Sequence, residues 1–373
     1  MKVQAARPFF AEEDIRGILK DVEENLRKGE LTLGQKVTTF EESFARYVGV
    51  KNSIAVNSGT AALEIVLRYL DLNGGEVIVP TNSFVASANT VHYAGGKAVI
   101  ADIRQHTLCL DPESLKEKIT SKTKAVMIVH LAGLITPDFY EIKKICEDNG
   151  LVLFEDSAQA HGASIDGKKS GSLSLAGCFS FFPTKPMTTG EGGIITTDDD
   201  NLDKFARSVR HHGIEGRDNY PRLGYNWRMP DINAILGLYQ LKHLDEYIKE
   251  RNSIAKMYQK ALSKFKNIKF VTYPENIVHA YYKHPIILPF DTFNLQKTLK
   301  EKYEIDTGFL YYPPIHMQPV YQNMFGYKIG MLPVSEGVLK KIVCLPMFVG
   351  ITDQQVNHVI ESLSIELENA GVA

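Results

Sequence analysis

The sequence predicts an α/β protein in which a large unit, built on a mostly parallel sheet covered by helices, is followed by a smaller C-terminal α+β unit. Three observations predict this fold. Between residues 53 and 197, short continuous apolar runs alternate with helix-length segments, a pattern typical of parallel strands buried on both faces. Beyond about residue 265 the pattern of apolar residues changes and predicts isolated strands and separate helices. The length of 373 residues suits one large unit and a smaller one.

The first two elements are amphipathic helices that precede the alternating region. Residues 12–28 carry apolar side chains at three- and four-residue steps, and Gly29 can end this helix. Residues 35–48 repeat the pattern through Val37, Phe40, Phe44 and Tyr47. We therefore expect two helices before the first strand.

Six apolar runs predict the strands of the large unit. In a sheet of this kind, ligands bind beyond the carboxyl ends of the strands, so the residues that directly follow each run are candidates for a site. The runs are SIAV (53–56), EVIVP (76–80), KAVIADI (97–103), AVMIVH (125–130), LVLFED (151–156) and GGIITT (192–197).

A long helical pattern from Pro230 to about Leu262 leads out of the large unit. Pro230 suits a first helical turn, and the charge of Asp231 complements the helix dipole there. Since this helix runs across the transition, we place the large unit at residues 1–250 and the small unit at residues 251–373.

The small unit is expected to mix strands and helices. Its predicted strands are KFVTY (269–273) and HPIILPF (284–290), and its predicted helices lie near 294–303 and over about 353–369.

Composition narrows the class of protein. A hydrophobic content of 44% and a net charge of −2 are ordinary for a globular protein and give no basis for charge-driven binding to nucleic acid or membranes. The four cysteines are far apart and form no metal-binding or disulfide pattern. No secretory signal and no apolar run of membrane-spanning length is present, so a cytoplasmic protein is expected.

The segment NSGTAAL (57–63) joins a predicted strand to a predicted helix. Ser58, Gly59 and Thr60 form a tight turn whose backbone N–H groups, together with the positive end of the helix dipole, would face a bound anion such as a phosphate. A plain helix cap, in which Ser58 or Thr60 satisfies the helix start, is the alternative.

Asp156 directly follows the apolar run LVLF (151–154) and Glu155, in the segment EDSAQAHGA (155–163). A carboxylate at the carboxyl end of a parallel strand should lie in the cleft, where it needs a cationic or hydrogen-bonding partner. The alternative is that Asp156 caps the start of the segment that follows it. Gln159 and His161 are close enough in sequence to share the cleft, although a lone histidine is more often structural.

Lys185 lies in the stretch SFFPTKPMTTGEGG (180–193), among aromatic residues, prolines and glycines. Apolar surroundings disfavour the charged ammonium form, and a neutral lysine amine is a good nucleophile toward an aldehyde. The alternative is a lysine that snorkels from a loop or pairs with Glu191. A phosphate-binding loop of the GxxxxGK type is absent, because the glycines follow the lysine.

Together, these three features match what pyridoxal 5′-phosphate requires. The helix start would take the phosphate, Asp156 would keep the pyridine nitrogen protonated, and Lys185 would take the aldehyde. No combination of His and Cys with metal-ligand spacing points to a metal.

Four segments in this order resemble the DegT/StrS sugar aminotransferases, which belong to the fold-type-I pyridoxal-phosphate enzymes. They are NSGTAAL, EDSAQAHGA, SFFPTKPMTTGEGG and GYNWRMPDINAILGL. The resemblance covers nearly the whole chain, since the segments FEESFARYVGV, IHMQPVY and CLPMFVGIT are also similar to the family.

The resemblance implies a role for each matching residue. Lys185 would bind the cofactor and shuttle a proton, and Asp156 would pair with the pyridinium. Gln159 would contact the phenolic oxygen, and Phe84 would stack on the ring. Phosphate contacts are implied for Thr60, Ala61 and Ser180, and for Asn226 toward the cofactor of a second subunit in a homodimer. His316 and Arg228 are implied on the substrate side.

The resemblance implies an aminotransferase that converts a keto sugar, most often a nucleotide-linked one, to an amino sugar, with glutamate as the amino donor. Two alternatives remain open on the same scaffold. One is an aminotransferase of a non-nucleotide sugar acid or a cyclitol. The other is a regulator that binds the cofactor without turnover.

Overall fold

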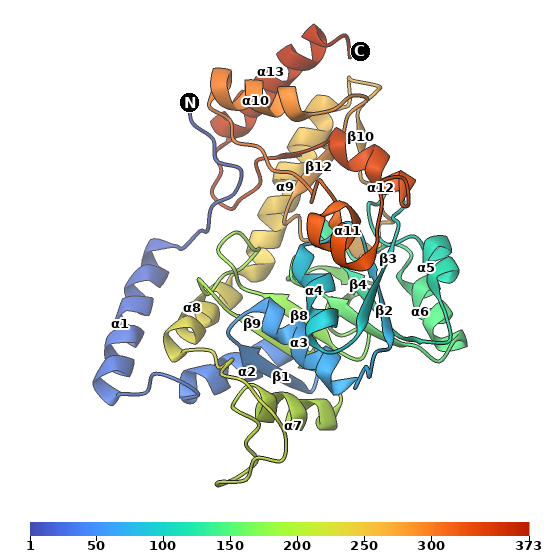
Figure 1. Ribbon diagram of the computed structural model, residues 1–373. Coiled ribbons are helices and arrows are strands. Elements are labelled where there is room, and N and C mark those ends of the chain that lie inside the picture. The colour runs from blue at the N-terminus through green and yellow to red at the C-terminus, as the bar shows by residue number, and fades with distance from the viewer. Residues whose placement is uncertain (373) are drawn as a thin grey trace.

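The computed structural model describes residues 1–372 and has a seven-stranded sheet at the centre of its larger part (Figure 1). The spatial order of the strands is β1-β9-β8-β5-β4-β2-β3. Only β9 runs antiparallel to its neighbours, and the other adjacent strands are parallel. The strands are β1 (Asn52–Val56), β2 (Glu76–Pro80), β3 (Lys97–Ala101), β4 (Thr123–Val129), β5 (Val152–Asp156), β8 (Gly177–Ser180) and β9 (Gly193–Thr197).

The alternation of side chains along the strands divides the core into two layers. Ile54 and Val79 point to one layer, whereas Ala55 and Ile78 point to the other. The first layer is covered by α3 (Gly59–Tyr69), α4 (Val85–Tyr93) and α7 (Asp200–Val209), and the second by α2 (Gln35–Val48), α5 (Pro112–Lys118), α6 (Phe139–Asp148) and α8 (Asp231–Lys242). The expected parallel sheet with helices on both faces is thus confirmed.

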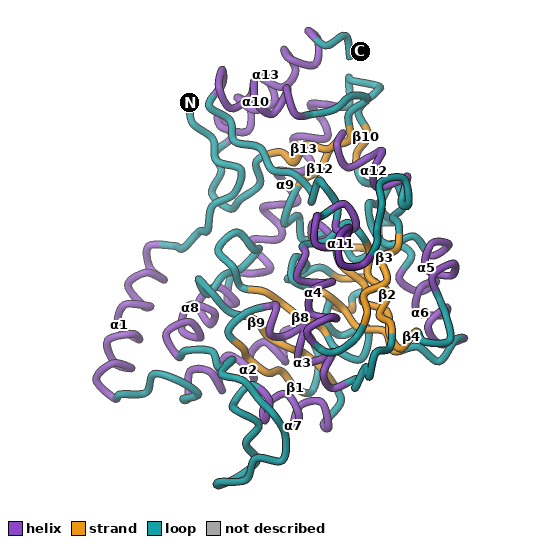
Figure 2. Tube along the Cα trace, in the orientation of Figure 1, coloured by secondary structure: helices purple, strands orange, loops and turns teal. Residues whose placement is uncertain are grey.

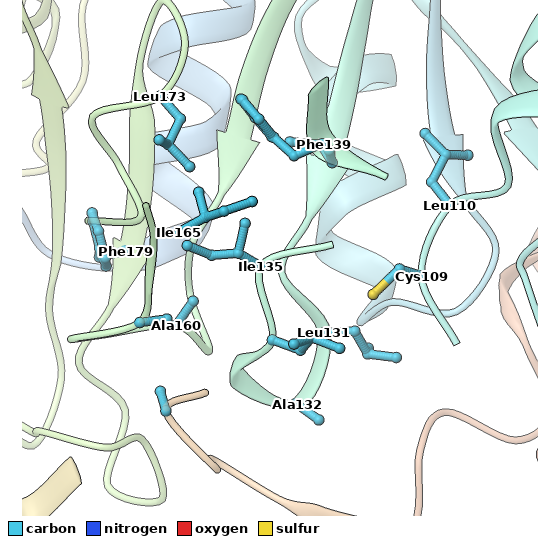
Figure 3. Close-up of a cluster of buried hydrophobic side chains, with 14 of the residues drawn as sticks. Cys109, Leu110, Leu131, Ala132, Ile135, Phe139, Ala160, Ile165, Leu173 and Phe179 are labelled. Carbon is cyan, nitrogen blue, oxygen red and sulfur yellow. The ribbon is translucent and has the colours of Figure 1, made fainter. Parts of the chain in front are cut away.

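Figure 3 shows part of the second layer. Phe139 of α6 lies near Ile135 and Ile165, and Phe179 of β8 lies across the cluster from Cys109. All these side chains are buried, so this layer forms a continuous apolar support beneath the carboxyl ends of β4 and β5.

The C-terminal region forms a second, antiparallel sheet with its own apolar core (Figure 2). Its strands are β10 (Lys269–Phe270), β12 (His284–Ile287) and β13 (Ile342–Leu345), and its helices are α9 (Leu244–Leu262), α10 (Phe293–Tyr303), α11 (Pro319–Phe325), α12 (Pro333–Val338) and α13 (Asp353–Asn369). A small third sheet joins β6 (Ser164–Ile165), β7 (Lys168–Lys169) and β11 (Ile277–Val278).

The N-terminal segment belongs in space to this C-terminal region. Val3 is fully buried in the C-terminal core and forms a β-bridge with Ile305. The chain then passes to α1 (Glu12–Lys28), which lies at the edge of the molecule beside α8. The proposed boundary at residue 250 falls inside α9, and the division into two units stays a prediction.

The structure differs from the sequence expectation in several places; the predicted strand at residues 269–273, for example, is a strand only at Lys269–Phe270. The helical pattern from Pro230 to Leu262 is two helices, because His243 leaves the helical conformation at φ −106° and ψ 2°, between α8 and α9. The His243 ring lies 3.0 Å from Asp14 of α1 and 3.2 Å from Glu246. These contacts stabilise the interruption between the two helices. The strand β8 was not expected, because its four residues lie beside a loop rich in Ser, Gly and Pro.

Within residues 1–372, no helix combines the length and the apolar character that crossing a bilayer requires.

Candidate active site

A cavity of about 450 Å³ opens at the carboxyl edge of the central sheet. Four loops that follow β1, β2, β5 and β8 meet there, since these strands are parallel and end at the same edge. Its size is typical of sites for small molecules. Eight of the residues predicted from the sequence line it, namely Ser58, Gly59, Thr60, Phe84, Asp156, Gln159, Ser180 and Lys185.

One end of the cavity is the start of α3. The hydroxyl of Ser58 accepts a hydrogen bond from the Ala61 N–H at 3.1 Å, so Ser58 is the helix cap that we gave as an alternative. Gly59 and Thr60 stand in the first turn, where N–H groups have no partner within the helix. A Cβ at Gly59 would lie 2.7 Å from the Cβ of Ser180, so only glycine allows this close approach. The helix start and the Ser180 hydroxyl therefore form one polar cradle for an anion.

Asp156 is 5% exposed and lies at the end of β5. One carboxylate oxygen accepts a hydrogen bond from the Ser87 hydroxyl at 2.7 Å, and the other accepts one from the Ala158 N–H at 3.1 Å. Burial raises the pKa of Asp156, while these two hydrogen bonds and the charge of Lys185 act in the opposite direction. A cation placed beside this carboxylate would supply the partner that its burial calls for.

Lys185 is half-buried and lines the cavity. Its Nζ is 4.6 Å from the centre of the Tyr282 ring, a cation–π contact. Among residues 1–372, no carboxylate lies within ion-pairing distance of Nζ, so the alternative of pairing with Glu191 is not what the structure shows. Burial would raise the pKa of Tyr282, but the charges of Lys185 and Lys283 bring it below its usual value.

Gln159 and Phe84 complete the cavity wall with residues from the C-terminal region. The Gln159 carbonyl oxygen accepts a hydrogen bond from the Ala132 N–H at 2.8 Å, and its amide donates one to the Tyr311 hydroxyl at 3.2 Å. Phe84 is 58% exposed, with its ring centre 6.2 Å from that of Tyr311. An exposed aromatic ring at the cavity mouth is available to stack on a planar ligand.

Four of the predicted residues do not line the cavity. Ala61 is buried in α3, where its N–H donates a hydrogen bond to the Ser58 hydroxyl. Asn226 and Arg228 lie in the segment before α8, where the Arg228 guanidinium donates a hydrogen bond to the Asn226 side-chain oxygen at 2.9 Å. His316 is fully buried, 2.7 Å from the Thr81 hydroxyl and 3.0 Å from Glu336. Both ring nitrogens are engaged by these two contacts, and the role of His316 on the substrate side stays a prediction.

His161 is also separate from the cavity. Its ring is buried between Phe179 and Phe181, at ring-centre distances of 5.1 and 5.4 Å. Burial, followed by the charge of Lys185, lowers the pKa of His161 to about 3. It is a neutral core residue, in line with the structural interpretation.

The sequence did not point to several residues that line the cavity. Ser87 lies in the first turn of α4, three residues after Phe84, the residue that precedes the helix, and this short separation could have pointed to it. Tyr282, Lys283, Phe309 and Tyr311 come from the C-terminal region, far along the chain, and nothing local in the sequence predicts where they pack.

The residues present fit pyridoxal phosphate. The cradle at Gly59 and Ser180 suits a phosphate, the buried Asp156 suits a protonated ring nitrogen, and the amine of Lys185 faces the same cavity. An α/β fold with such a site at the carboxyl edge of its sheet defines the class of fold-type-I pyridoxal-phosphate enzymes.

Comparison with known proteins agrees with this class of enzyme. The sequence model of the DegT/DnrJ/EryC1/StrS aminotransferase family matches residues 13–364. GDP-perosamine synthase of Caulobacter vibrioides is 35% identical, over 89% of this chain and 90% of that protein. The structure of PseC of Helicobacter pylori, an aminotransferase involved in pseudoaminic acid biosynthesis, has a TM-score of 0.91 and 27% identity, and covers 99% of this chain and 100% of that one.

A third relative bears on the cofactor. The structure of NtdA of Bacillus subtilis holds pyridoxamine phosphate and has a TM-score of 0.89 and 29% identity, with 96% of this chain and 83% of that chain covered. The chain belongs to the DegT/DnrJ/EryC1/StrS aminotransferase family. It is a pyridoxal-phosphate-dependent sugar aminotransferase.

Proposed function

We propose that this enzyme transfers an amino group from glutamate to the ketone of a nucleotide-linked sugar. The observation that carries the proposal is the meeting of Lys185, Asp156 and the start of α3 on one cavity. When bound, pyridoxal phosphate supplies an aldehyde that carries the amino group and a ring that takes up an electron pair. The residues of the chain bind it, orient it and move protons beside it.

Lys185 and Asp156 have separate roles in this proposal. The Lys185 amine holds the cofactor and then moves a proton as general base and general acid. Asp156, fixed by Ser87 and the Ala158 N–H, holds the proton of the ring nitrogen in place. Because both of its oxygens are already oriented, little reorganisation is needed when charge develops on the ring.

The remaining lining residues position the cofactor. Thr60 and Ser180, with Ser58 and Gly59 at the helix start, bind the phosphate, and the Ala61 N–H supports the turn through Ser58. Gln159, held by Ala132 and Tyr311, faces the phenolic oxygen, and the exposed ring of Phe84 stacks on the cofactor. These hydrogen bonds fix the side chains that contact the cofactor.

We also propose a homodimer with shared active sites. Asn226 lies outside the cavity of its own chain, next to the loop at residues 213–224 that projects from the body of the molecule (Figure 1). Asn226 is exposed, and Arg228 donates a hydrogen bond to its side-chain oxygen. In a dimer, Asn226 of a second copy would reach the cofactor phosphate, with Arg228 close to the shared site.

The identity of the substrate is tested by separate half-reactions. The purified holoenzyme is mixed with glutamate, and the conversion of the cofactor to its pyridoxamine form is followed by absorbance. The aminated enzyme is then mixed with UDP-, GDP- and dTDP-linked ketosugars, and in parallel with free ketosugars, keto sugar acids and keto cyclitols. We expect turnover with a nucleotide-linked sugar, at least ~100-fold faster than with the free sugar. Turnover of the free compounds alone would replace the proposal with the sugar-acid or cyclitol alternative.

A further inference from the structure

Lys283 is a second cation on the wall of the active-site cavity. It is half-buried and directly precedes β12, and it lines the cavity beside Tyr282. Its Nζ lies 5.6 Å from the ring centre of Tyr282 and 5.5 Å from those of Phe309 and Tyr311. It donates a hydrogen bond to the Phe309 carbonyl at 2.7 Å. An ammonium group has three donors, so this contact leaves capacity for a ligand.

The charges of the cavity show what Lys283 is free to bind. The charged side chains on its wall are Asp156, Lys185, Glu191 and Lys283. The proposed function assigns Lys185 and Asp156 to the cofactor, which leaves Lys283 as the cation on the substrate side. In the part of the chain that the structure describes, no carboxylate lies within 4.0 Å of its Nζ. A cation that is partly withdrawn from water and has no anionic partner is suited to an anionic ligand.

A neighbouring groove indicates where the rest of a ligand that carries such an anion could bind. Phe309 also lines a second cavity, of about 590 Å³, between α10 and the segment around residue 340. That cavity has aromatic walls from Phe293 and Tyr312, and it is also lined by Lys297, Lys340 and the ion pair of Lys300 with Asp306, at 3.3 Å. Aromatic surface next to several lysines suits a ligand that joins a flat ring to phosphate groups.

We propose that Lys283 is the specificity-determining residue that binds an oxyanion of the substrate. The oxyanion is either the diphosphate of the nucleotide-linked sugar or the carboxylate of the amino donor, and the adjoining groove favours the diphosphate. The inference rests on the proposed function, because that function assigns Lys185, the other cation of the cavity, to the cofactor. The rings of Tyr282, Phe309 and Tyr311 lie around the ammonium group, and the Phe309 carbonyl holds it through a hydrogen bond.

Calorimetric titration of the pyridoxal-phosphate-saturated enzyme tests the proposal without turnover. The probes are UDP, GDP and dTDP for the diphosphate, and glutarate for the carboxylate. The variants are Lys283→Met, which removes the charge, and Lys283→Arg, which keeps it. Lys264→Met is the matched control, because Lys264 also lies over an aromatic ring, 4.8 Å from the centre of Phe265, but does not line the cavity.

We expect Lys283→Met to weaken binding of at least one nucleoside diphosphate by about tenfold or more, since a charge-assisted hydrogen bond is lost. Lys283→Arg should restore the affinity to within about threefold, and Lys283→Met should also reduce the dependence of affinity on salt. Glutarate binding should not change. Weakened binding of glutarate alone would support the proposal with the carboxylate as the anion.

Three results would overturn the assignment. One is unchanged affinity for every probe in Lys283→Met, and another is no binding of any probe by the unaltered enzyme. The third is an equal loss for all probes that Lys283→Arg does not restore, which indicates a structural role. Binding that depends on Lys283 in an enzyme that aminates no nucleotide-linked ketosugar would refute the proposed function and leave this assignment standing.

Discussion

At the scale of single residues, the chemistry of the cavity depends on how Asp156 and Lys185 are held. Asp156 is buried, and its two oxygens are fixed by one hydroxyl and one backbone N–H. Lys185 is only half-buried, and an aromatic ring rather than a carboxylate holds its amine. The carboxylate is therefore rigid, while the amine can be released and taken up again, as a proton-transferring group must be.

Asp156→Asn tests the role of this carboxylate. An amide has the same shape, and it can accept the Ala158 N–H with its oxygen and donate to the Ser87 hydroxyl, but it cannot stabilise a protonated ring nitrogen. We expect kcat to fall by about 100-fold or more, in the range found when one preorganised electrostatic group is removed. The measurement is steady-state kinetics of the purified variant. Asp353→Asn, at the exposed start of α13, is the control and should retain full activity.

At the scale of elements, the site depends on the close packing of α3 against β8. The absent side chain of Gly59 lets the helix start lie directly against Ser180. On the other side, a Cβ at Gly193 of β9 would lie 2.3 Å from the Ser58 carbonyl oxygen. The anion cradle is thus formed by two glycines that allow a strand–turn–helix unit to close on its neighbours.

Gly59→Ala tests this packing. The new Cβ would force α3 away from β8, so we expect the free energy of unfolding to fall by about 1–3 kcal/mol and cofactor affinity to fall by about tenfold. Urea unfolding and fluorescence titration with pyridoxal phosphate measure the two effects. Gly337→Ala is the matched control, because a Cβ in that helical position meets no atom within 4 Å. Equal effects of the two changes would contradict the account.

Much of this element-level picture could be predicted from the sequence, and the reasons are local. The apolar runs that end at Val56 and Asp156 directly place Ser58 and Asp156 at the carboxyl edge, because parallel strands end at one edge. The strand β8 could not be predicted, since its four residues carry too little periodicity. Tyr282 and Lys283 were missed because the packing of the C-terminal region against the cavity is not encoded in a local pattern.

At the scale of the whole molecule, one helix and several buried groups connect the central sheet to the C-terminal region. Arg251 of α9 is 3% exposed and donates hydrogen bonds to the carbonyl oxygens of Tyr281 and Met347, at 3.0 and 3.2 Å. Near these contacts, His279 and His284 are buried as neutral rings. Burial lowers the pKa of His279 to about 3 and that of His284 to about 4.

These histidines predict an acid-dependent loss of stability. Because their pKa values are lower in the folded state, the unfolded chain binds more protons, and stability rises with pH. Their contribution is complete above the unfolded pKa near 6.5 and is lost as the pH falls toward 4. At pH 5.5 each such histidine should lower the free energy of unfolding by about 1 kcal/mol relative to pH 7.5.

Urea unfolding at the two pH values measures this loss, and His284→Gln is the informative variant. Glutamine cannot take up a proton. The difference in unfolding free energy between pH 7.5 and 5.5 should therefore become smaller by about the amount that one histidine contributes. An unchanged difference would show that His284 titrates alike in the folded and unfolded states.

The central claim is that the amine of Lys185 is the group that holds pyridoxal phosphate, in a cavity where the carboxylate of Asp156 lies nearby. Reduction of the holoenzyme with borohydride, followed by digestion and peptide mass spectrometry, tests it most directly. We predict a single labelled peptide that contains Lys185, and no label in Lys185→Ala. A label on Lys283 or another lysine, or label of equal amount in Lys185→Ala, would contradict the account.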